Sequence, residues 1–488
     1  MAETKSGTTG NDTLISQAGD TVYGLAGADF ITATGDGGVI YGNTGNDTLN
    51  SLGANTLFGG KGDDSLKSSA GKSVLYGDLG ADILIATFQD TLYGNDSLNT
   101  DTGNDTLIAQ AQSLLFGGKG KDSLIGATTA TLYGGQDDDI LIGQGSGYLS
   151  GDKGNDSLLG KAGDTLLGRE DADTLVSQGA TLLFGNEGKD ILTIQGAIAN
   201  VTMYGGQGSD TIYGNGKNGI LYGDKDNDYI VATVAGATAT DRDTVFGGDG
   251  ADTILGSGGK DFIIGGNSAE GGNDSLDGAD TIITYNDADT VYGGGGNDVI
   301  ILGSGNNYAD GGSDGDSIVG GDDQDTIIGG EGSDTLIGWK GADTLTGGAG
   351  ADYFVYIGGA FATGGVFTDA GGITPITTVG DLGIDTITDF EIAADKIVLD
   401  GQGTVAGFTN ANPNGIFTAF STNVLPSVAI ATSTAGVTQT NAQLIYSQAD
   451  GKLFYNPAAA INPNPAPIHF LTLQAGLEGL TSQNFLIV

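Results

Sequence analysis

Residues 311–352 read GGSDGDSIV, GGDDQDTII, GGEGSDTLI, GWKGADTLT and GGAGAD, and this stretch decides the fold. Each unit has nine places, with glycine first, aspartate sixth and an aliphatic residue eighth. The sixth-place residues are Asp316, Asp325, Asp334, Asp343 and Asp352. So regular a period predicts a solenoid in which one short structural unit is stacked many times.

The places of the unit have a physical interpretation. Glycine at the first, second and fourth places allows backbone angles that a side chain would forbid, so we expect each loop to curl until its carbonyls converge. The sixth-place aspartate adds a carboxylate, and a set of oxygen ligands suits calcium better than zinc or copper. The three residues after the aspartate fit a short strand whose middle residue points inward. Two such loops and strands would make one turn of a flattened parallel β-roll, with calcium between stacked loops.

This repeat resembles the RTX (repeats-in-toxin, hemolysin-type) calcium-binding nonapeptide. The resemblance extends over nearly the whole chain and implies many calcium ions as the cofactor. It also implies an RTX protein that stands alone, without an attached catalytic domain, and is exported by type I secretion machinery.

Composition supports one long all-β solenoid with a terminal domain rather than several globular domains. The 488 residues include 91 glycines and no cysteine, and carry a formal charge of -44. This charge excludes electrostatic binding to nucleic acid or anionic lipid, and the chain would repel itself unless cations neutralise it. A solvated acidic surface of the halophile kind is the alternative, but the acids recur in register rather than being scattered. No run approaches the ~18 apolar residues of a membrane span, and Met1–Leu14 lacks the apolar core of a secretory signal.

Residues 1–246 form the first predicted domain, in which the sixth-place acids usually recur every 17 or 18 residues, a full turn of the roll. They are Asp12, Asp29, Asp47, Asp64, Asp82, Asp105, Asp122, Asp139, Asp156, Asp173, Asp190, Asp210 and Asp228. The other half of each turn keeps its strand but has lost the glycine-rich loop, so we expect calcium along one edge only. Loops 134–139, 168–173 and 223–228 have aspartate where the fourth-place glycine belongs, which places their ion binding in question.

Residues 247–352 form the second predicted domain, in which the step falls to nine residues and both edges should carry ions. The acids that precede the 311–352 stretch here are Asp252, Asp261, Asp280, Asp289 and Asp298. Trp339 replaces a second-place glycine, and we expect its loop to be distorted.

Residues 353–488 form the third predicted domain, a β-rich cap with a secretion signal. Residues 353–356 fit a last strand of the roll. The segment 385–400, DTITDFEIAADKIVLD, resembles the segment that closes RTX rolls, with Ala394 where the family usually has glycine. Residues 443–446 and 452–455 fit a hairpin, and the NFLIV tail resembles the C-terminal signal of type I secretion substrates.

An aromatic residue stands in the ninth place of many turns, where it should point outward and stack. The set is Tyr23, Tyr41, Phe58, Tyr76, Tyr93, Phe116, Tyr133, Phe184, Tyr204, Tyr222 and Phe246. Such a ladder stabilises its own sheet, or offers an exposed strip for self-association or for a cell-surface glycan.

The sequence lacks the usual catalytic motifs, so we expect no enzyme. There is no HExxH, no GxSxG on a strand-to-helix turn, and His469 is the only histidine. The first expected function is a secreted, calcium-folded structural protein that polymerises at the cell surface, with an extracellular adhesin or glycan-binding module as the alternative. The repeat starts at Gly7, and we expect the first turn to dock onto another copy and give a filament.

Overall fold

The computed structural model describes residues 2–95, 101–179, 182–196, 198–215, 217–232, 242–266, 276–357 and 384–400, residues 477 and 480, and the segments 423–424, 428–431, 444–447, 451–455, 468–473 and 484–487. It contains two compact units, Met1–Lys225 and Asp226–Val488, which are described separately below. None of the described residues forms a helix long and apolar enough to cross a membrane.

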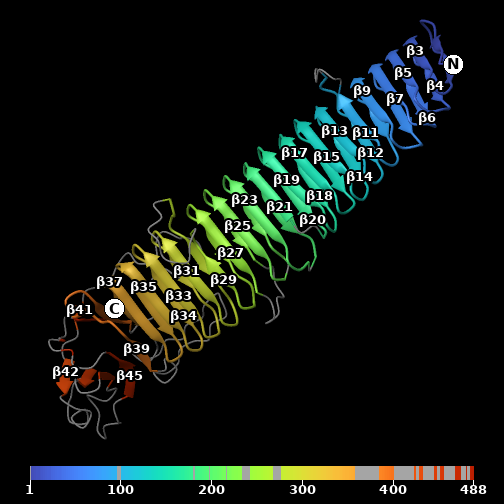
Figure 1. The fold of residues 1–488 in the computed structure, drawn as a ribbon. Helices are drawn as coiled ribbons and strands as arrows, with labels where there is room; N and C mark the ends of the chain where they lie inside the picture. The colour runs from blue at the N-terminus through green and yellow to red at the C-terminus, as the bar shows by residue number, and fades with distance from the viewer. Residues whose placement is uncertain are drawn as a thin grey trace. The chain divides into compact units, whose positions relative to one another are not determined.

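Unit 1 is a parallel β-roll in which the chain alternates between two sheets (Figure 1). Its odd-numbered strands form sheet A, and each pairs in parallel with the next odd-numbered strand. Sheet A consists of β1 (Thr4–Ser6), β3 (Thr21–Ala26), β5 (Val39–Thr44), β7 (Thr56–Lys61), β9 (Val74–Leu79), β11 (Thr91–Asn95), β13 (Leu114–Lys119), β15 (Thr131–Gln136), β17 (Tyr148–Lys153), β19 (Thr165–Glu170), β21 (Leu182–Glu187), β23 (Thr202–Gln207) and β25 (Ile220–Lys225).

The even-numbered strands of unit 1 form sheet B, again with parallel pairing throughout. They are β2 (Thr13–Ser16), β4 (Phe30–Ala33), β6 (Thr48–Ser51), β8 (Ser65–Ser68), β10 (Ile83–Ile85), β12 (Thr106–Ala109), β14 (Ser123–Gly126), β16 (Ile140–Gly143), β18 (Ser157–Gly160), β20 (Thr174–Ser177), β22 (Ile191–Ile194) and β24 (Thr211–Tyr213). At the first edge of the roll the chain passes from sheet A to sheet B, and at the second edge it returns.

The core of unit 1 is two facing rows of aliphatic residues, one from each sheet. Leu57 pairs with Leu75 in sheet A and Leu49 with Leu66 in sheet B, and all four are fully buried. These are the eighth-place residues, whose inward direction is therefore confirmed. The register survives the longer connection after β11, because β10 still pairs residue for residue with β12.

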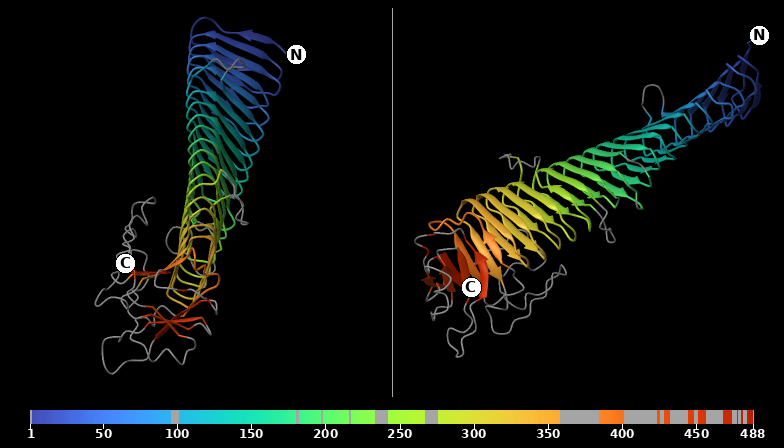
Figure 2. Two further views of the ribbon diagram at one scale, coloured as in Figure 1. Left: turned by 90° about the vertical axis from the view of Figure 1, so that its left-hand side faces the viewer. Right: turned by 60° about the horizontal axis from the view of Figure 1, so that its bottom comes forward.

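Unit 2 repeats the arrangement, as two further views show (Figure 2). One sheet contains β27 (Thr244–Asp249), β29 (Phe262–Ile264), β31 (Thr290–Gly295), β33 (Tyr308–Ser313), β35 (Thr326–Gly332), β37 (Thr344–Gly350) and β39 (Asp385–Ile387). The other contains β26 (Tyr229–Val231), β28 (Thr253–Leu255), β30 (Thr281–Ile283), β32 (Val299–Ile301), β34 (Ser317–Gly321), β36 (Thr335–Trp339), β38 (Tyr353–Ile357) and β40 (Lys396–Asp400). The prediction of an all-β parallel roll is confirmed.

The last described strands continue both sheets of unit 2. Strand β45 (Ile468–Thr472) pairs in parallel with β39, and β46 (Phe485–Ile487) pairs with β40. The sequence had predicted that residues 353–356 form the last strand of the roll. That prediction was wrong, because β38 (Tyr353–Ile357) is followed in its sheet by β40. The predicted hairpin is confirmed, since β43 (Leu444–Ser447) and β44 (Lys452–Tyr455) pair antiparallel, and the remaining strands are β41 (Asn423–Val424) and β42 (Val428–Ala431).

Candidate calcium sites

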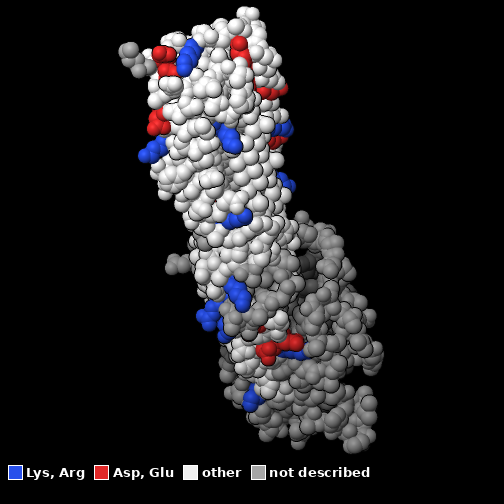
Figure 3. Space-filling model, turned by 90° about the vertical axis from the view of Figure 1, so that its right-hand side faces the viewer, with Lys and Arg blue, Asp and Glu red and all other residues white. Residues whose placement is uncertain are grey.

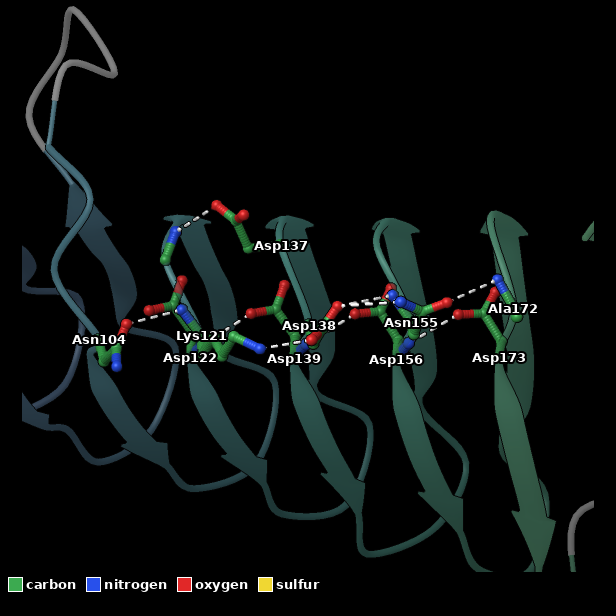
Figure 4. Close-up of polar contacts among 11 residues, drawn as sticks. Asn104, Lys121, Asp122, Asp137, Asp138, Asp139, Asn155, Asp156, Ala172 and Asp173 are labelled. Carbon is green, nitrogen blue, oxygen red and sulfur yellow. Dashed lines mark hydrogen bonds and ion pairs between the residues drawn. The ribbon is translucent and has the colours of Figure 1, made fainter.

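The sixth-place aspartates of the first edge form a ladder that runs along each unit. The backbone N–H of Asp122 donates to Oδ1 of Asp139 at 2.7 Å, and Asp139 N–H donates in turn to Asp156 Oδ1 (Figure 4). In unit 1 the ladder joins Asp12, Asp29, Asp47, Asp64, Asp82, Asp105, Asp122, Asp139, Asp156, Asp173, Asp190 and Asp210. In unit 2 it joins Asp228, Asp252, Asp280, Asp298, Asp316, Asp334, Asp352 and Asp395.

The second carboxylate oxygen, Oδ2, is the unusual atom of this ladder. It is buried and accepts no hydrogen bond from any described residue in Asp29, Asp47, Asp64, Asp82, Asp105, Asp122, Asp139, Asp156, Asp173, Asp190, Asp252, Asp280, Asp298, Asp316 and Asp334. A buried polar atom without a partner costs free energy, and one repeated at turn after turn needs a common explanation. A cation at each position supplies one.

The first-place glycine explains the space beside each open oxygen. A methyl group on Gly59 would lie 2.4 Å from Asp64 Oδ2 and 2.6 Å from the carbonyl oxygen of Gly77 in the next turn. A carboxylate oxygen and a backbone carbonyl therefore face the same small volume, which any other side chain would fill. Hard oxygen donors of these two kinds are the ligands that calcium prefers, so the residues fit the ion.

Glycine at the other two places has the conformational role that the sequence predicted. Gly60 and Gly62, the second and fourth places, have φ of 114° and 118°. Gly59 has no such positive φ. The prediction that backbone angles require the first-place glycine was therefore wrong, since this residue is needed for space beside the carboxylate.

Burial raises the pKa of the ladder carboxyls, and the hydrogen bond to Oδ1 only partly offsets it. The pKa rises to about 8 for Asp64, about 9 for Asp139 and about 10 for Asp298. For Asp298 the carboxylates of Asp316 and Asp280 add to the effect of burial. Ionised carboxylates are thus unfavourable in the metal-free fold, and bound cations would reverse this. Few acidic atoms are visible on the face in Figure 3.

The loops with aspartate in the fourth place keep the backbone of the others. Asp137, Asp171 and Asp226 adopt φ of 71–75°, the left-handed region that glycine occupies elsewhere. Trp339 likewise adopts φ of 75° in the second place, and it packs against the cluster Val319, Ile337, Val355 and Val398. The distortion expected at Trp339 is therefore absent from the backbone of this loop.

The fifth-place residues form a second set of contacts between turns of the first edge. The N–H of Lys121 donates to Asn104 Oδ1 at 2.8 Å, and the N–H of Ala172 donates to Asn155 Oδ1 at 3.2 Å (Figure 4). Lys121 also forms an ion pair with Asp138. These contacts hold neighbouring loops in register without using the open oxygens.

The second edge of unit 1 contains aspartates of a different kind. Oδ2 of Asp90 accepts the N–H of Thr87, and Oδ2 of Asp164 accepts the N–H of Lys161, three residues earlier in each case. Asp20 receives the N–H of Gln17 and the Lys5 ammonium, and these contacts hold its pKa at about 2. Each carboxylate is satisfied within the protein and needs no ion.

The loops at the second edge of unit 2 differ from one another in whether they leave a carboxylate oxygen open beside a first-place glycine. Oδ2 of Asp325 is buried without a partner among the described residues, and burial raises the pKa of Asp325 to about 8. Asp343 also faces its first-place glycine, Gly338. Asp261 instead accepts the N–H of Ser257. At Asp289 the first place of the loop is Thr284 rather than glycine.

At the first aspartate of the ladder in unit 1 and at the last aspartate of the ladder in unit 2, the chain itself supplies hydrogen bonds to Oδ2. Oδ2 of Asp12 accepts both the N–H and the hydroxyl of Thr8. Oδ2 of Asp395 accepts the N–H of Glu391. Asp12 was expected to be an ion ligand, but its Oδ2 already accepts two hydrogen bonds from Thr8.

The sequence prediction missed Asp385 and Asp395, which extend the two ladders beyond Asp343 and Asp352. A signal for both was present, because each precedes a polar and then an aliphatic residue, as the sixth-place acids do. Asp389, also missed, accepts the N–H groups of Gly347 and Gly348 with its two oxygens.

Metal binding by side chains alone does not fit the described residues. Among them, no three carboxylate or imidazole side chains lie close enough together to hold an ion. Any calcium must therefore be held largely by backbone carbonyls. The only histidine, His469, lies with Nε2 3.1 Å from Leu471 O and from Thr472 Oγ1.

The predicted aromatic ladder is confirmed on the outer face of sheet A. Rings from Tyr23 to Tyr133 stack on one another in successive turns, with centroids 4.8–5.1 Å apart and planes within 8°. Ser150 and Leu167 interrupt the row before it resumes at Phe184. Each ring face inside a stack is covered by its neighbour, which leaves mainly ring edges to solvent.

Comparison with known proteins gives one family. The family model described as RTX calcium-binding nonapeptide repeat (4 copies) matches residues 6–37, 16–49, 50–84, 90–113, 131–146, 142–175, 204–233, 239–276, 274–309, 310–345 and 319–354, which together make up more than half of the chain. No curated protein matches the sequence.

Proposed function

The chain belongs to the RTX calcium-binding nonapeptide repeat family, and from this premise we propose that it is a secreted structural protein. It folds outside the cell when calcium binds and then assembles into a surface layer, sheath, fibril or extracellular matrix. A structural rather than catalytic role is part of this proposal.

The row of open Oδ2 atoms supports calcium-dependent folding most directly. In calcium-poor surroundings the buried carboxylates destabilise the roll, and ordering a glycine-rich chain costs much conformational entropy. An ion that binds only the folded chain stabilises it by mass action, so millimolar calcium outside the cell drives folding.

The same property suits export by type I secretion machinery. A chain that stays unfolded at low calcium can pass through a narrow channel and fold on the other side. The tail that resembles the secretion signal includes strand β46, which pairs with β40 in the folded protein. It is therefore available as an extended signal only before folding.

Electron microscopy of the purified protein, with calcium and with a chelator, tests the structural role. Ordered filaments or sheets in calcium and none in chelator are the expected result. Magnesium at the same concentration is the control, because its smaller shell and strict octahedral geometry suit these loops poorly. Only dispersed particles in calcium at high protein concentration would contradict self-assembly.

Glycan binding is a second candidate, at the interruption of the aromatic ladder. A hollow of about 210 Å³ lies there, lined in part by Phe116, Tyr133, Gln136, Asp152 and Lys153. Aromatic and polar groups of this kind suit one or two sugar rings. Saturable binding of an oligosaccharide that is lost in Tyr133→Ala would support this candidate, and an unchanged isotherm in that variant would reject this hollow as the site.

A further inference from the structure

An unbroken aliphatic row runs along the outer face of sheet B in unit 1. Its members are the ninth-place residues of successive turns, and each is paired in register with the next. This aliphatic strip consists of Ile85, Ile108, Ile125, Ile142, Leu159 and Val176. All are at least partly exposed, so a row of methyl groups meets water along six turns.

The positions beside the strip are also uncharged. The other outward residue of each strand is isoleucine, serine or threonine: Ile83, Thr106, Ser123, Ile140, Ser157 and Thr174. Ile83 and Ile140 are 46% and 50% exposed. The strip ends where Lys67 pairs with Ile85 on one side and Thr193 pairs with Val176 on the other.

The aliphatic strip differs from the aromatic ladder on the opposite sheet. The rings of the ladder cover each other, and its tyrosines carry hydroxyl groups that favour water. The strip has no polar side-chain atom, and in the part of unit 1 that the structure describes its side chains are at least partly exposed. Burial therefore favours the strip more than the ladder, since apolar area removed from water is what stabilises a contact.

We propose that the aliphatic strip is the surface through which two copies of this chain pack face to face, related by a two-fold axis. The inference rests on the self-assembly proposed above and names the surface that carries it. A second copy fits because the residues of its own strip have the same spacing of ~4.8 Å from strand to strand. The side chains of the two strips can therefore interdigitate along their whole length. It also fits by charge, because a chain of charge -44 approaches its own copy most easily through a face without carboxylates.

The dimensions suit the core of an interface. Six rungs span roughly 30 Å, and the two outward rows of each strand lie ~7 Å apart. A stable contact buries ~800 Å² on each partner, with an apolar centre and a polar rim. The rim here holds the Lys121–Asp138 ion pair on one side of the strip and the Lys161–Gln144 hydrogen bond on the other.

A pair of lysine variants tests the proposal in the full-length, calcium-loaded chain. Ile125→Lys with Ile142→Lys places two charges in the middle of the strip. Lys67 already occupies the same row, so the fold accepts lysine there. Thr32→Lys with Asn50→Lys, in the same row but outside the strip, is the matched control.

Sedimentation velocity measures the outcome. The wild type and the control should form dimers or larger species as concentration rises, whereas the strip variant should need at least ten-fold more protein. Circular dichroism must show the same β-content in all three. If the strip variant assembles like the wild type, the strip is not the contact surface, although the proposed self-assembly still stands. If the wild type stays monomeric at every concentration, both proposals are wrong.

A single introduced cysteine gives an independent readout, because the chain contains none. In the two-fold arrangement, Ile125→Cys lies near the centre of the strip and should form a disulfide-linked dimer on mild oxidation in calcium. Thr32→Cys should form at least ten-fold less of the disulfide-linked dimer under the same conditions. Equal cross-linking at the two positions would overturn the proposed geometry.

Discussion

The second edge of unit 1 and the second edge of unit 2 occupy the same place in the roll but handle their carboxylates differently. In unit 1, Asp90 and Asp164 are bonded by N–H groups of their own loops. In unit 2, Asp325 keeps an open Oδ2 beside Gly320, whose added methyl group would lie 2.6 Å from it. An aspartate before a strand is therefore not sufficient for a calcium site.

The difference follows from the length of the loop before the aspartate. In the short loops of unit 1, the N–H three residues earlier reaches the carboxylate and takes the place of an ion. In the nine-residue units before Asp325 and Asp343, the second- and fourth-place residues, Gly321 with Asp323 and Trp339 with Gly341, all have positive φ. They carry the chain around a wider curl, and the carboxylate oxygen stays open. The repeat thus offers two solutions to the same buried charge, one internal and one that requires a cation.

The largest effect expected from this comparison is unfolding on removal of calcium. At pH 8 and in chelator, both units should lose most of their β-structure, because each contains a first-edge ladder of open oxygens. Far-ultraviolet circular dichroism measures the loss, and restored calcium should reverse it. Sodium chloride at equal ionic strength is the control for charge screening, and equal β-content with and without calcium would contradict the interpretation.

Sequence reasoning predicted the roll and the first-edge ladder because both depend on the spacing of residue types. Glycine, aspartate and leucine recur at fixed places, and the pleat of a strand then decides which side chains point inward. The stacked rings of Tyr23 and Tyr41 follow from the same periodicity.

The features that were missed depend on individual hydrogen bonds. The sequence cannot show that Thr8 donates twice to Asp12, or that Ser257 donates to Asp261. It also could not separate the two roles of glycine. Gly59 leaves space beside a carboxylate, whereas Gly60 adopts a positive φ. Asp395 was missed because the nine-residue step is lost between it and Asp352.

Acid should partly replace calcium at the open sites. The pKa values of Asp64 and Asp139 rise to about 8 and 9 in the metal-free fold, from an ordinary value of 3.8. The folded chain therefore binds protons more tightly than the unfolded one, and its stability increases as the pH falls from about 9 toward 4. Asp20, with a pKa of about 2, acts in the opposite sense, and its contribution is lost only as the pH falls below about 4.

Circular dichroism in chelator at pH 5 and pH 8 tests this sign. More β-structure at pH 5 is expected, together with a higher calcium concentration for half-saturation, because protons compete with the ion. A chelated chain equally unfolded at both pH values would show that protonation cannot substitute for the cation.

A pair of substitutions on the second edge compares the units directly. Asp325→Asn should reduce calcium affinity at that site by ~10-fold or more. Asp164→Asn should leave calcium binding unchanged but lower the free energy of unfolding by about 1–3 kcal/mol. Asp164 accepts the N–H groups of Lys161 and Gly147 with its two oxygens, and asparagine has only one oxygen to offer them. Calorimetric titration and thermal unfolding in saturating calcium separate the two effects. Lost ion binding in Asp164→Asn would mean that the internal bond had been misinterpreted.

The smallest effect is expected at Asn307, which occupies the second-edge ladder between Asp289 and Asp325. Its amide donates to the carbonyl of Gly305, and the first place of its loop is Leu302 rather than glycine. Asn307→Asp would therefore add a buried carboxylate without a space for an ion. We expect no additional calcium and a loss of about 1–3 kcal/mol of stability at pH 8, recovered at pH 5 as the new group protonates.

Asn306→Asp, at an exposed position, should change neither quantity. An additional calcium ion bound by Asn307→Asp would show that the carboxylate alone defines a site and that the first-place glycine does not.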